Sequence, residues 1–583
     1  MPLLDFRNTN SLWASVLVET LVRLGLQTAV VSPGSRSTPL TMALASHPKV
    51  DAVPILDERS AAFFGLGIAK RTGLPVVLVC TSGTAGANYY PAVIEAQESR
   101  VPLLVLTADR PPELRDCASG QTIDQQKLFG NFPNWYAELA TPLPDLEMLR
   151  YLRQTLLQAW TRTLVPTAGP VHLNCPFRDP LAPLTDGSVA HLEEAIDNSF
   201  FASIASKPPV SLRAENLHPV STLLQRWRDC EQGLIVAGQS QPADADAYCR
   251  AVANLCHHLN WPVLAEGLSP LRNHGELNPY LVTTYDIVLR QPQWSEDLTA
   301  QQVIQIGPLP TSKVLRQWLS TTNPQRWVLS SGYSNLDPLH GRTTSLPFSL
   351  QQLPLLPEEL PSVASQYRNT WLSLEQKVRH HLDAAFSDLD TIFEGKIPWM
   401  MAQHLPQGTP VMIANSLPIR DVEWFWPPGN RRIRPLCNRG ANGIDGTLST
   451  ALGIAHQGPP TVLLTGDLAL LHDTNGWLSV PRLQGHLTVI LINNHGGGIF
   501  EMLPIAKFDP PFEEFFATPQ TVDFNHLCAA YGVNYERVES WKQLQACLSF
   551  LPERGVRVLE VRCERKASQQ VRQNLLNLKA QNA

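Results

Sequence analysis

The 583-residue sequence lacks several features, and each absence excludes a class of protein. No apolar run reaches transmembrane length. The N-terminal residues have no basic region followed by the long apolar core of a secretory signal. The ten cysteines are scattered without a CxxC pair, which indicates reduced thiols in a cytoplasmic protein. With a net charge of −6 there is no excess of positive charge, which argues against a nucleic-acid partner.

What is present is the composition of a globular protein with several domains. Hydrophobic residues make up 44% of the chain and charged residues 17%, and 583 residues are too many for one core. Apolar runs alternate with helical patterns, which predicts an α/β fold. Two Pro-rich stretches, 179–212 and 353–362, are predicted linkers. We therefore expect domains at residues 1–185, 210–358 and 380–583.

The clearest strand–helix–strand unit lies in residues 461–500. Two apolar runs, 462–464 and 487–492, flank a helical stretch at 468–483. Continuous apolar runs of this length are typical of buried parallel strands. The segment is therefore predicted to form a βαβ unit.

A carboxylate and an amide follow the two strands of this unit. Asp467 comes after the first strand and Asn494 after the second. Ligands of parallel sheets collect at the edge where the strands end, which we call the carboxyl edge. The oxygens of both side chains suit Mg²⁺, and glycines 496–498 let backbone approach it. Together these features favour a metal site over the alternative, a helix-capping Asp and an Asn/Gly turn.

The Gly466-Asp467 and Asn494 pattern resembles the metal–diphosphate motif of thiamine-diphosphate enzymes, although Leu468 stands where that family usually has glycine. The resemblance implies that Asp467, Asn494 and the carbonyl of Gly496 hold Mg²⁺ or Mn²⁺. It also implies three doubly wound parallel-sheet domains, namely a pyrimidine-binding, a middle and a diphosphate-binding domain. The family's cofactor lies between the first domain of one subunit and the third of another, so the resemblance implies a homodimer or homotetramer.

Glu58 lies where a predicted strand gives way to a helix. By position alone it is only a favourable partner of the helix dipole. The resemblance implies that Glu58 is catalytic, binds the pyrimidine ring of the cofactor and exchanges a proton with it. That task favours a carboxyl group whose pKa is raised by apolar surroundings. The resemblance further implies cofactor contacts for Thr81, Gly83, Ser416, Ile444, Gly466 and Ile499.

The segment SPGSRSTPL, residues 32–40, follows the first predicted strand and turns into a helix. Its free amides, its hydroxyls and Arg36 suit an anion. A capping turn with a solvated arginine is an equal alternative. Arg110 and Gln121 follow a later strand and are further candidates for the carboxyl edge.

Longer segments, among them SPGSRSTPL, DERSAAF, TADRPPELRDC and NNHGGGIF, resemble one branch of the same family. That branch is a carboligase, a transferase that joins 2-oxoglutarate to isochorismate with loss of CO₂, in menaquinone and phylloquinone biosynthesis. The two substrates bring four carboxylates, whose recognition needs several cations. The resemblance implies substrate contacts for Ser35, Arg36, Arg110, Gln121, Lys313, Arg420, Arg439, Phe500 and Leu503. The alternative is separate surface charges and ordinary apolar core residues.

Three other functions compete with this hypothesis. The nearest is a thiamine-diphosphate enzyme for a smaller 2-oxo acid, which would need fewer cations. A dinucleotide-dependent dehydrogenase would need GxGxxG after its first strand, and HGGGIF has the wrong spacing. A scaffold protein without activity would have no need for Glu58, Asp467 and Asn494 together. Outside these motifs, the segment CERKAS, residues 563–568, is predicted to be a solvated basic turn.

Overall fold

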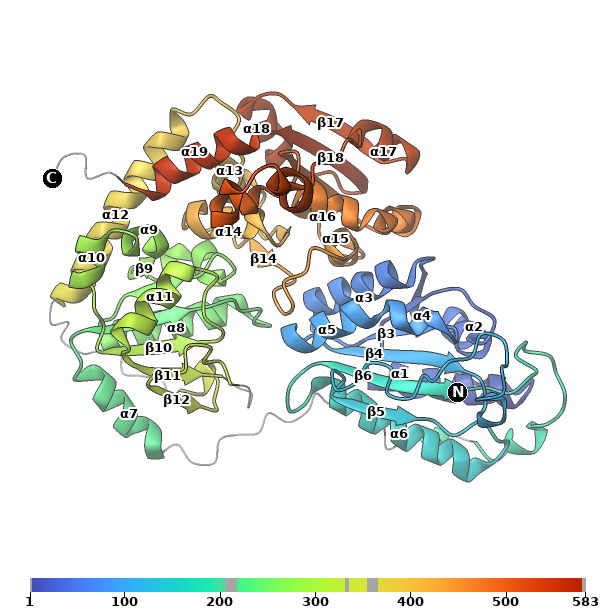
Figure 1. Ribbon diagram of the computed structural model, residues 1–583. Helices are drawn as coiled ribbons and strands as arrows, with labels where there is room; N and C mark the ends of the chain where they lie inside the picture. The colour runs from blue at the N-terminus through green and yellow to red at the C-terminus, as the bar shows by residue number, and fades with distance from the viewer. Residues whose placement is uncertain are drawn as a thin grey trace. The chain divides into compact units, whose positions relative to one another are not determined.

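Three six-stranded parallel sheets flanked by helices make up the chain (Figure 1), which confirms the predicted α/β class. The computed structural model describes residues 3–196, 198–202, 204, 218–330, 335–353 and 365–578. Of the two predicted linkers, residues 205–212 of the first and 354–362 of the second lie outside these residues. The three-domain boundaries stay a prediction. No helix in the described ranges is long and apolar enough to cross a membrane.

The first sheet has the strand order β2-β1-β3-β4-β6-β5. Its strands are β1 (Thr28–Val31), β2 (Asp51–Pro54), β3 (Val76–Cys80), β4 (Leu103–Asp109), β5 (Trp135–Glu138) and β6 (Pro170–Pro176). The helices of this region are α1 (Thr9–Leu24), α2 (Thr38–Ser46), α3 (Glu58–Thr72), α4 (Thr84–Asn88), α5 (Tyr90–Ser99) and α6 (Leu146–Leu164). Strands β1, β3, β4 and β6 are buried along their whole length, which explains why they read as continuous apolar runs.

The third sheet repeats this order as β14-β13-β15-β16-β18-β17. Its strands are β13 (Pro410–Ile413), β14 (Arg434–Leu436), β15 (Thr461–Gly466), β16 (His486–Asn493), β17 (Asn534–Val538) and β18 (Gly555–Arg562). Its helices are α13 (Lys396–His404), α14 (Leu417–Phe425), α15 (Thr447–Ala455), α16 (Asp467–His472), α17 (Phe524–Ala530), α18 (Trp541–Ser549) and α19 (Arg565–Leu576). In this order the chain passes from β13 to a neighbour on one side, β14, and from β15 to a neighbour on the other side, β16. A ligand crevice is therefore expected at the carboxyl edge between β13 and β15.

The middle sheet is wound differently, as β12-β11-β10-β7-β8-β9. Its strands are β7 (Gly233–Ala237), β8 (Val263–Ala265), β9 (Leu281–Val282), β10 (Gln302–Ile306), β11 (Gln325–Leu329) and β12 (Thr343–Leu346). The helices are α7 (His218–Arg228), α8 (Ala245–Leu259), α9 (Tyr285–Leu289), α10 (Pro292–Asp297), α11 (Lys313–Thr322) and α12 (Gln366–Ser387). This is the strand order of dinucleotide-binding Rossmann sheets. At its crevice, however, a Cβ on Gly238 would lie 1.8 Å from the carbonyl oxygen of Pro308, so protein backbone fills that point.

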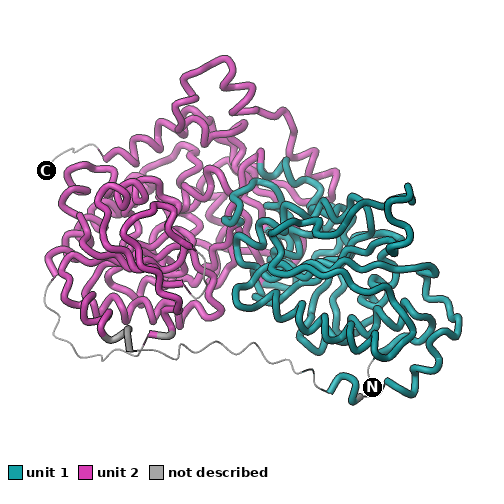
Figure 2. Tube along the Cα trace, turned by 60° about the horizontal axis from the view of Figure 1, so that its bottom comes forward, with its two compact units in different colours: residues 1–211, 438–458, 469–487 teal, residues 212–437, 459–468, 488–583 magenta. Residues whose placement is uncertain are grey.

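The chain divides into two compact units, coloured separately in Figure 2. The first comprises residues 1–211, 438–458 and 469–487, and the second comprises 212–437, 459–468 and 488–583. Helix α15 therefore belongs to the first unit, where it packs on α3. A Cβ on Gly67 would lie 2.0 Å from the carbonyl oxygen of Thr450, and one on Gly453 would lie 2.0 Å from that of Phe64. The two helices meet backbone to backbone, which only glycine permits at these positions.

The helix expected at residues 468–483 is interrupted, so this prediction is wrong in detail. Helix α16 ends at His472, and a 3₁₀ segment follows at Thr474–Arg482. Asp473, between them, accepts hydrogen bonds from the amide and the hydroxyl of Ser449 at 2.7 and 3.0 Å. Pro481 lacks the amide hydrogen that a continuous α-helix would need.

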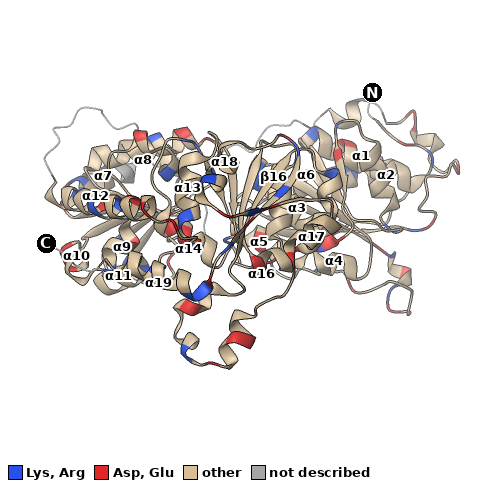
Figure 3. Ribbon diagram, turned by 90° about the horizontal axis from the view of Figure 1, so that it is seen from above, with Lys and Arg blue, Asp and Glu red and all other residues tan. Residues whose placement is uncertain are grey.

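Lys and Arg on the one hand and Asp and Glu on the other are both distributed over the helices and loops (Figure 3). Their numbers are similar, 46 and 52, which gives the net charge of −6.

Candidate active site

Asp467, Asn494 and Gly496 come together at the carboxyl edge of the third sheet. Asp467 is buried, and its two oxygens accept from the amides of Leu468 at 2.9 Å and Gly496 at 2.8 Å. Burial raises the pKa of the Asp467 carboxyl to about 6, while these amides act in the opposite direction. Gly496 has φ +120°, and a Cβ there would lie 2.1 Å from the carbonyl oxygen of Ala517. The turn after β16 therefore requires glycine at this position.

Asn494 presents a buried oxygen that no protein group uses. Its Nδ2 donates to Glu394 Oε2 at 2.8 Å. Its Oδ1 is buried and has no hydrogen-bond partner among the described residues. Buried acceptors of this kind are rare in folded proteins and call for an explanation. An oxygen-binding cation beside Asp467 would supply the missing partner.

The donor set suits an ion that also binds ligand oxygens. Within the described residues no cluster of three or more His, Cys, Asp or Glu side chains could hold a metal. Mg²⁺ commonly takes one or two carboxylates and completes its shell with phosphate oxygens and water. The residues present therefore fit Mg²⁺ or Mn²⁺ together with a diphosphate.

Ser416 and Gly466 lie at the crevice of the third sheet, after β13 and at the end of β15. Ser416 has φ +72° and ψ −123°, a strained backbone for a residue other than glycine. Its carbonyl oxygen accepts from the guanidinium of Arg420, one turn along α14. A Cβ on Gly466 would meet no atom within 4 Å, so space is open beside it.

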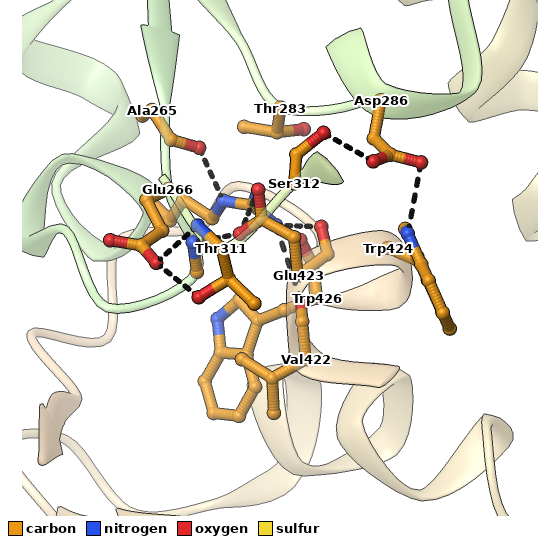
Figure 4. Close-up of polar contacts among 12 residues, drawn as sticks. Ala265, Glu266, Thr283, Asp286, Thr311, Ser312, Val422, Glu423, Trp424 and Trp426 are labelled. Atoms are coloured by element: carbon orange, nitrogen blue, oxygen red, sulfur yellow. Dashed lines mark hydrogen bonds and ion pairs between the residues drawn. The ribbon is translucent and has the colours of Figure 1, made fainter. Parts of the chain in front are cut away.

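The C-terminal end of α14 is held by residues that lie around the middle sheet, here called the middle region (Figure 4). The fully buried Arg272 donates to the carbonyl oxygens of Val422, Glu423 and Trp426, with Glu423 at 2.9 Å. Glu423 Oε2 also accepts from the amide of Gly267 at 2.6 Å, and its Oε1 accepts from the hydroxyl of Tyr285. These contacts hold the helix that begins directly after Ser416.

Two further acidic residues, Asp286 and Glu266, are drawn with these contacts in Figure 4. Trp424 donates to Asp286 at 2.9 Å, and Ser312 also donates to Asp286. Glu266 Oε1 accepts from the amide and the hydroxyl of Thr311 at 2.9 and 2.7 Å. These residues carry no sequence motif, so only the structure reveals them.

A second ionic cluster lies behind Asn494 and was also missed from the sequence. Arg572 of α19 donates to Glu394 at 2.7 Å and to both oxygens of Asp421 at 2.8 and 3.0 Å. All three side chains are about 1% exposed. The cluster therefore ties α19 and α14 to the residue that orients Asn494.

The segment CERKAS is not a solvated turn, so that prediction is wrong. Arg565 begins α19, and only 10% of its side chain is exposed. It donates to Glu501 and Glu513, both at 2.6 Å, and to the carbonyl oxygen of His495 at 2.7 Å. Because three acceptors satisfy its charge, burial is tolerated. Arg565 thus pins the loop that follows β16.

That loop carries the predicted apolar contacts Ile499, Phe500 and Leu503. Ile499 and Phe500 are half-buried, and Leu503 is 37% exposed. The ring of Phe500 packs edge-on against Phe516 at 5.8 Å. Lys313, another predicted cation of the second unit, is exposed at the first residue of α11.

Glu58 is the first residue of α3 in the first unit. Asp57 caps the helix by accepting from the amide of Ser60 at 2.9 Å. Glu58 is half-buried, and burial raises the pKa of its carboxyl. This direction agrees with the expected apolar setting of Glu58.

Arg36 and Arg110 lie close together at the carboxyl edge of the first sheet. Arg36 is buried and donates to the carbonyl oxygen of Phe177 at 2.9 Å. Burial lowers its pKa, and the charge of Arg110 lowers it further. The ion pair of Arg36 with the exposed Asp179 is long, at 3.6 Å. Two guanidinium groups at the same edge of the sheet favour an anion there.

Ser82 joins the other candidates of this edge. Its hydroxyl accepts from Arg110 at 2.6 Å, and its carbonyl oxygen accepts from Gln121 at 2.9 Å. A Cβ on Gly34 would lie 2.2 Å from that of Thr81, so the turn that carries the exposed Ser35 lies against the turn after β3. The structure thus brings these predicted residues together at one edge of the first sheet.

Gly83 has φ +83°, and its amide donates to the buried Gln125 at 2.8 Å. Gln125 follows a loop without a motif, and no signal in the sequence identified it.

The loop that carries Arg439 and Ile444, both half-buried, is anchored by Glu95 of α5. Glu95 accepts from the amides of Gly440 at 3.1 Å and Ala441 at 2.7 Å. It is 2% exposed and lies 3.4 Å from the ammonium group of Lys70. A buried glutamate on a helix usually signals a structural partner, but the sequence did not identify this one.

Comparison with known proteins places these features in a family. Three thiamine pyrophosphate enzyme models match: the N-terminal TPP-binding domain at residues 13–128, the middle domain at 206–409 and the C-terminal TPP-binding domain at 430–561. Relatives named 2-succinyl-5-enolpyruvyl-6-hydroxy-3-cyclohexene-1-carboxylate synthase match almost end to end. The Nostoc sp. protein is 56% identical over 99% of both chains, and the Trichodesmium erythraeum protein is 55% identical over 97% of both. The Rippkaea orientalis protein is 54% identical over 97% of this chain and 95% of its own. The chain therefore belongs to the thiamine pyrophosphate enzyme family, among its 2-succinyl-5-enolpyruvyl-6-hydroxy-3-cyclohexene-1-carboxylate synthases.

Proposed function

We propose that this chain is a thiamine-diphosphate-dependent carboligase of menaquinone and phylloquinone biosynthesis. It removes CO₂ from 2-oxoglutarate and adds the remaining four-carbon unit to isochorismate, giving 2-succinyl-5-enolpyruvyl-6-hydroxy-3-cyclohexene-1-carboxylate. The observation that carries this proposal is the identity of 54–56% to synthases of that name over nearly the whole chain. The arrangement around Asp467 and Asn494 supports it independently.

The cofactor is assigned to the carboxyl edges of the first and third sheets. When bound, thiamine diphosphate supplies the electron sink for decarboxylation of a 2-oxo acid. Asp467, Asn494 and the carbonyl of Gly496 would hold Mg²⁺ or Mn²⁺. Further cofactor contacts are assigned to Thr81, Gly83, Ser416, Ile444, Gly466 and Ile499. The buried Oδ1 of Asn494 and the open space beside Gly466 support this assignment.

Glu58 is assigned to proton exchange with the pyrimidine ring of the cofactor. Its carboxyl has a raised pKa because of burial, which brings it closer to the neutral pH at which it must both take and give a proton. It makes no ion pair within the described part of the chain that would hold it ionised.

The substrate carboxylates are assigned to the predicted cations and their neutral neighbours. Arg36 and Arg110 lie near each other, and the carboxylates beside Arg110 are taken by Arg115, which pairs with Asp109 and Glu138 at 3.0 Å. Lys313 lies in the first turn of α11, where its positive charge is unfavourable beside the positive end of the helix dipole. The remaining contacts are assigned to Ser35, Gln121, Arg420, Arg439, Phe500 and Leu503.

The active assembly is assigned as a cytoplasmic homodimer or homotetramer. Large apolar side chains are exposed close to the candidate residues: Leu56 at 64%, Phe508 at 64% and Phe515 at 69%. Where such side chains form a contiguous apolar patch, they are expected to be covered by another subunit.

The test follows isochorismate absorbance after mixing the protein with thiamine diphosphate, Mg²⁺ and 2-oxoglutarate. The proposal expects a loss of absorbance that requires every component. Decarboxylation of 2-oxoglutarate with isochorismate left untouched would preserve the cofactor assignment and refute the acceptor. No reaction and no binding of thiamine diphosphate would refute both.

A further inference from the structure

We propose that Glu394 is a positioning residue that decides which end of the Asn494 amide faces the metal. The proposal rests on the metal site proposed above and deepens it. Asn494 can present either its oxygen or its NH₂ group toward Asp467, and only the oxygen can bind a cation. The fold must therefore select one of two side-chain orientations that have nearly the same shape.

Glu394 makes this selection through its charge. An ionised carboxylate only accepts hydrogen bonds, so it binds the NH₂ end of Asn494 and excludes the oxygen end. The contact is 2.8 Å between Asn494 Nδ2 and Glu394 Oε2. As a result Asn494 Oδ1 points away from Glu394 and stays without a partner among the described residues.

Arg572 keeps Glu394 in the state that this selection needs. It donates to Glu394 Oε1 at 2.7 Å and is 1% exposed. A guanidinium is always charged and only donates, so Oε1 is held as an acceptor. Asp421 accepts from the same guanidinium and fixes its plane. Arg572, Glu394 and Asn494 thus form a directed chain that ends at the metal position.

Replacing Glu394 by its amide should reverse the last link of this chain. In Glu394→Gln the new side-chain oxygen stays on Arg572, because Arg572 needs an acceptor. The new NH₂ group then faces Asn494, whose oxygen turns toward it. The NH₂ group of Asn494 would face the cation, a repulsive arrangement.

The test measures Mg²⁺ affinity in the presence of excess thiamine diphosphate, followed by tryptophan fluorescence. We expect Glu394→Gln to weaken Mg²⁺ by about 10- to 100-fold, the usual effect of losing a partner of a metal ligand. The matched control is Glu423→Gln, another buried glutamate held by an arginine, which should leave Mg²⁺ affinity within about threefold.

A double variant separates orientation from mere stability. Glu394→Gln combined with Asn494→Asp swaps the acid and the amide, so charge and hydrogen-bond count are unchanged. The acceptor-only carboxylate at position 494 can receive the new NH₂ group and still offer an oxygen to the metal. We expect this double variant to bind Mg²⁺ within about threefold of the unmodified protein.

Each outcome decides the question. Unchanged affinity in Glu394→Gln, or a folded double variant no tighter than the single one, would overturn the proposal. If the single variant does not fold, the double variant decides alone: near-native Mg²⁺ affinity supports the proposal, and a tenfold loss overturns it. If the unmodified protein itself does not bind Mg²⁺, the proposed metal site fails instead.

Discussion

Two buried glutamates in the second unit are held alike and serve different ends. Glu423 accepts from Arg272 and Glu394 accepts from Arg572, and both arginines are fully buried. Both glutamates bear on α14: Glu423 is one of its residues, and Arg572 links Glu394 to Asp421, another of its residues. In sequence the two glutamates look equivalent, because neither stands in a motif.

The two clusters differ in where their hydrogen bonds end. Around Glu423, Gly267 and Tyr285 supply the remaining donors, so both of its oxygens are satisfied within the protein. Around Glu394 the second donor is Asn494, whose own oxygen is left buried and without a partner among the described residues. The first cluster joins α14 to residues around the middle sheet, whereas the second leads to Asn494, the proposed metal ligand. A buried ion pair by itself therefore does not reveal its role. The role is indicated by the group at the end of its hydrogen bonds, and by whether that group has a partner within the protein.

Glu58 differs most from these two glutamates, because no arginine pairs with it in the described ranges. We expect Glu58→Gln to keep the cofactor bound but to lower kcat by about 10²- to 10⁴-fold, because an amide cannot exchange the proton. The measurement is steady-state isochorismate consumption together with thiamine diphosphate binding. Glu147→Gln is the matched control, because Glu147 also lies in the first turn of a helix. Near-normal turnover in Glu58→Gln would remove Glu58 from the mechanism.

The arginines of the two clusters test the comparison directly. Arg572→Met and Arg272→Met each leave buried carboxylates without their cation, so each should lower the free energy of unfolding by about 3–5 kcal/mol. Only Arg572→Met should also weaken Mg²⁺, since only its cluster reaches Asn494. Urea unfolding and a Mg²⁺ titration measure the two effects.

Lys566→Met serves as the control on α19, because the Lys566 side chain is 72% exposed and its ion pair is long, at 3.7 Å. It should change neither quantity. Equal losses of Mg²⁺ affinity in Arg572→Met and Arg272→Met would show that the two clusters do not differ in their effect on the metal site.

The same distinction explains what the sequence could predict. Strands such as β3 and β16 are buried throughout and read as apolar runs, so the α/β class and the carboxyl-edge position of Asp467 and Asn494 followed from local pattern. The resemblance supplied the role proposed for Glu58, which position alone would not have given. Strand order did not follow, because it depends on pairing between distant segments.

The supporting residues could not be predicted, and the reason is physical. Arg572 and Glu394 are 178 residues apart, and Arg272 and Glu423 are 151 apart. No local period or spacing links such partners. Arg565 was misjudged for the same reason: a basic segment looks solvated until Glu501 and Glu513 are seen beside it.

Unlike Glu394 and Glu423, Asp473 is a buried carboxylate that forms no ion pair among the described residues. Burial raises its pKa to about 7, although two bonds from Ser449 favour the charged form. The folded state thus holds a proton that the unfolded state releases near pH 4. The free energy of unfolding should therefore fall as pH rises from about 4 to about 7 and level off above that.

Asp473→Asn keeps an acceptor for the Ser449 amide and a partner for its hydroxyl, but it cannot ionise. It should flatten this pH dependence and be more stable than the parent at pH 8 by about 2–4 kcal/mol. Urea unfolding at pH 5 and pH 8 measures the change, with the exposed Asp229→Asn as control. A parallel decline of both proteins with pH would show that other groups carry the dependence.

Gly466 tests whether the open space beside a glycine is kept for a ligand. A Cβ at Gly466 or at Gly429 meets no atom within 4 Å, and neither residue has a positive φ, so alanine is compatible with the fold at both. Only Gly466 lies at the crevice of the third sheet, beside Asp467. Gly466→Ala should therefore weaken thiamine diphosphate by about tenfold or more through steric overlap, while Gly429→Ala should leave its affinity unchanged. Calorimetric titration of thiamine diphosphate at saturating Mg²⁺ gives both affinities, and urea midpoints check that both variants fold as the parent does. If the two alanines behave alike, the open space beside Gly466 is ordinary solvent, and the cofactor must lie elsewhere along this edge.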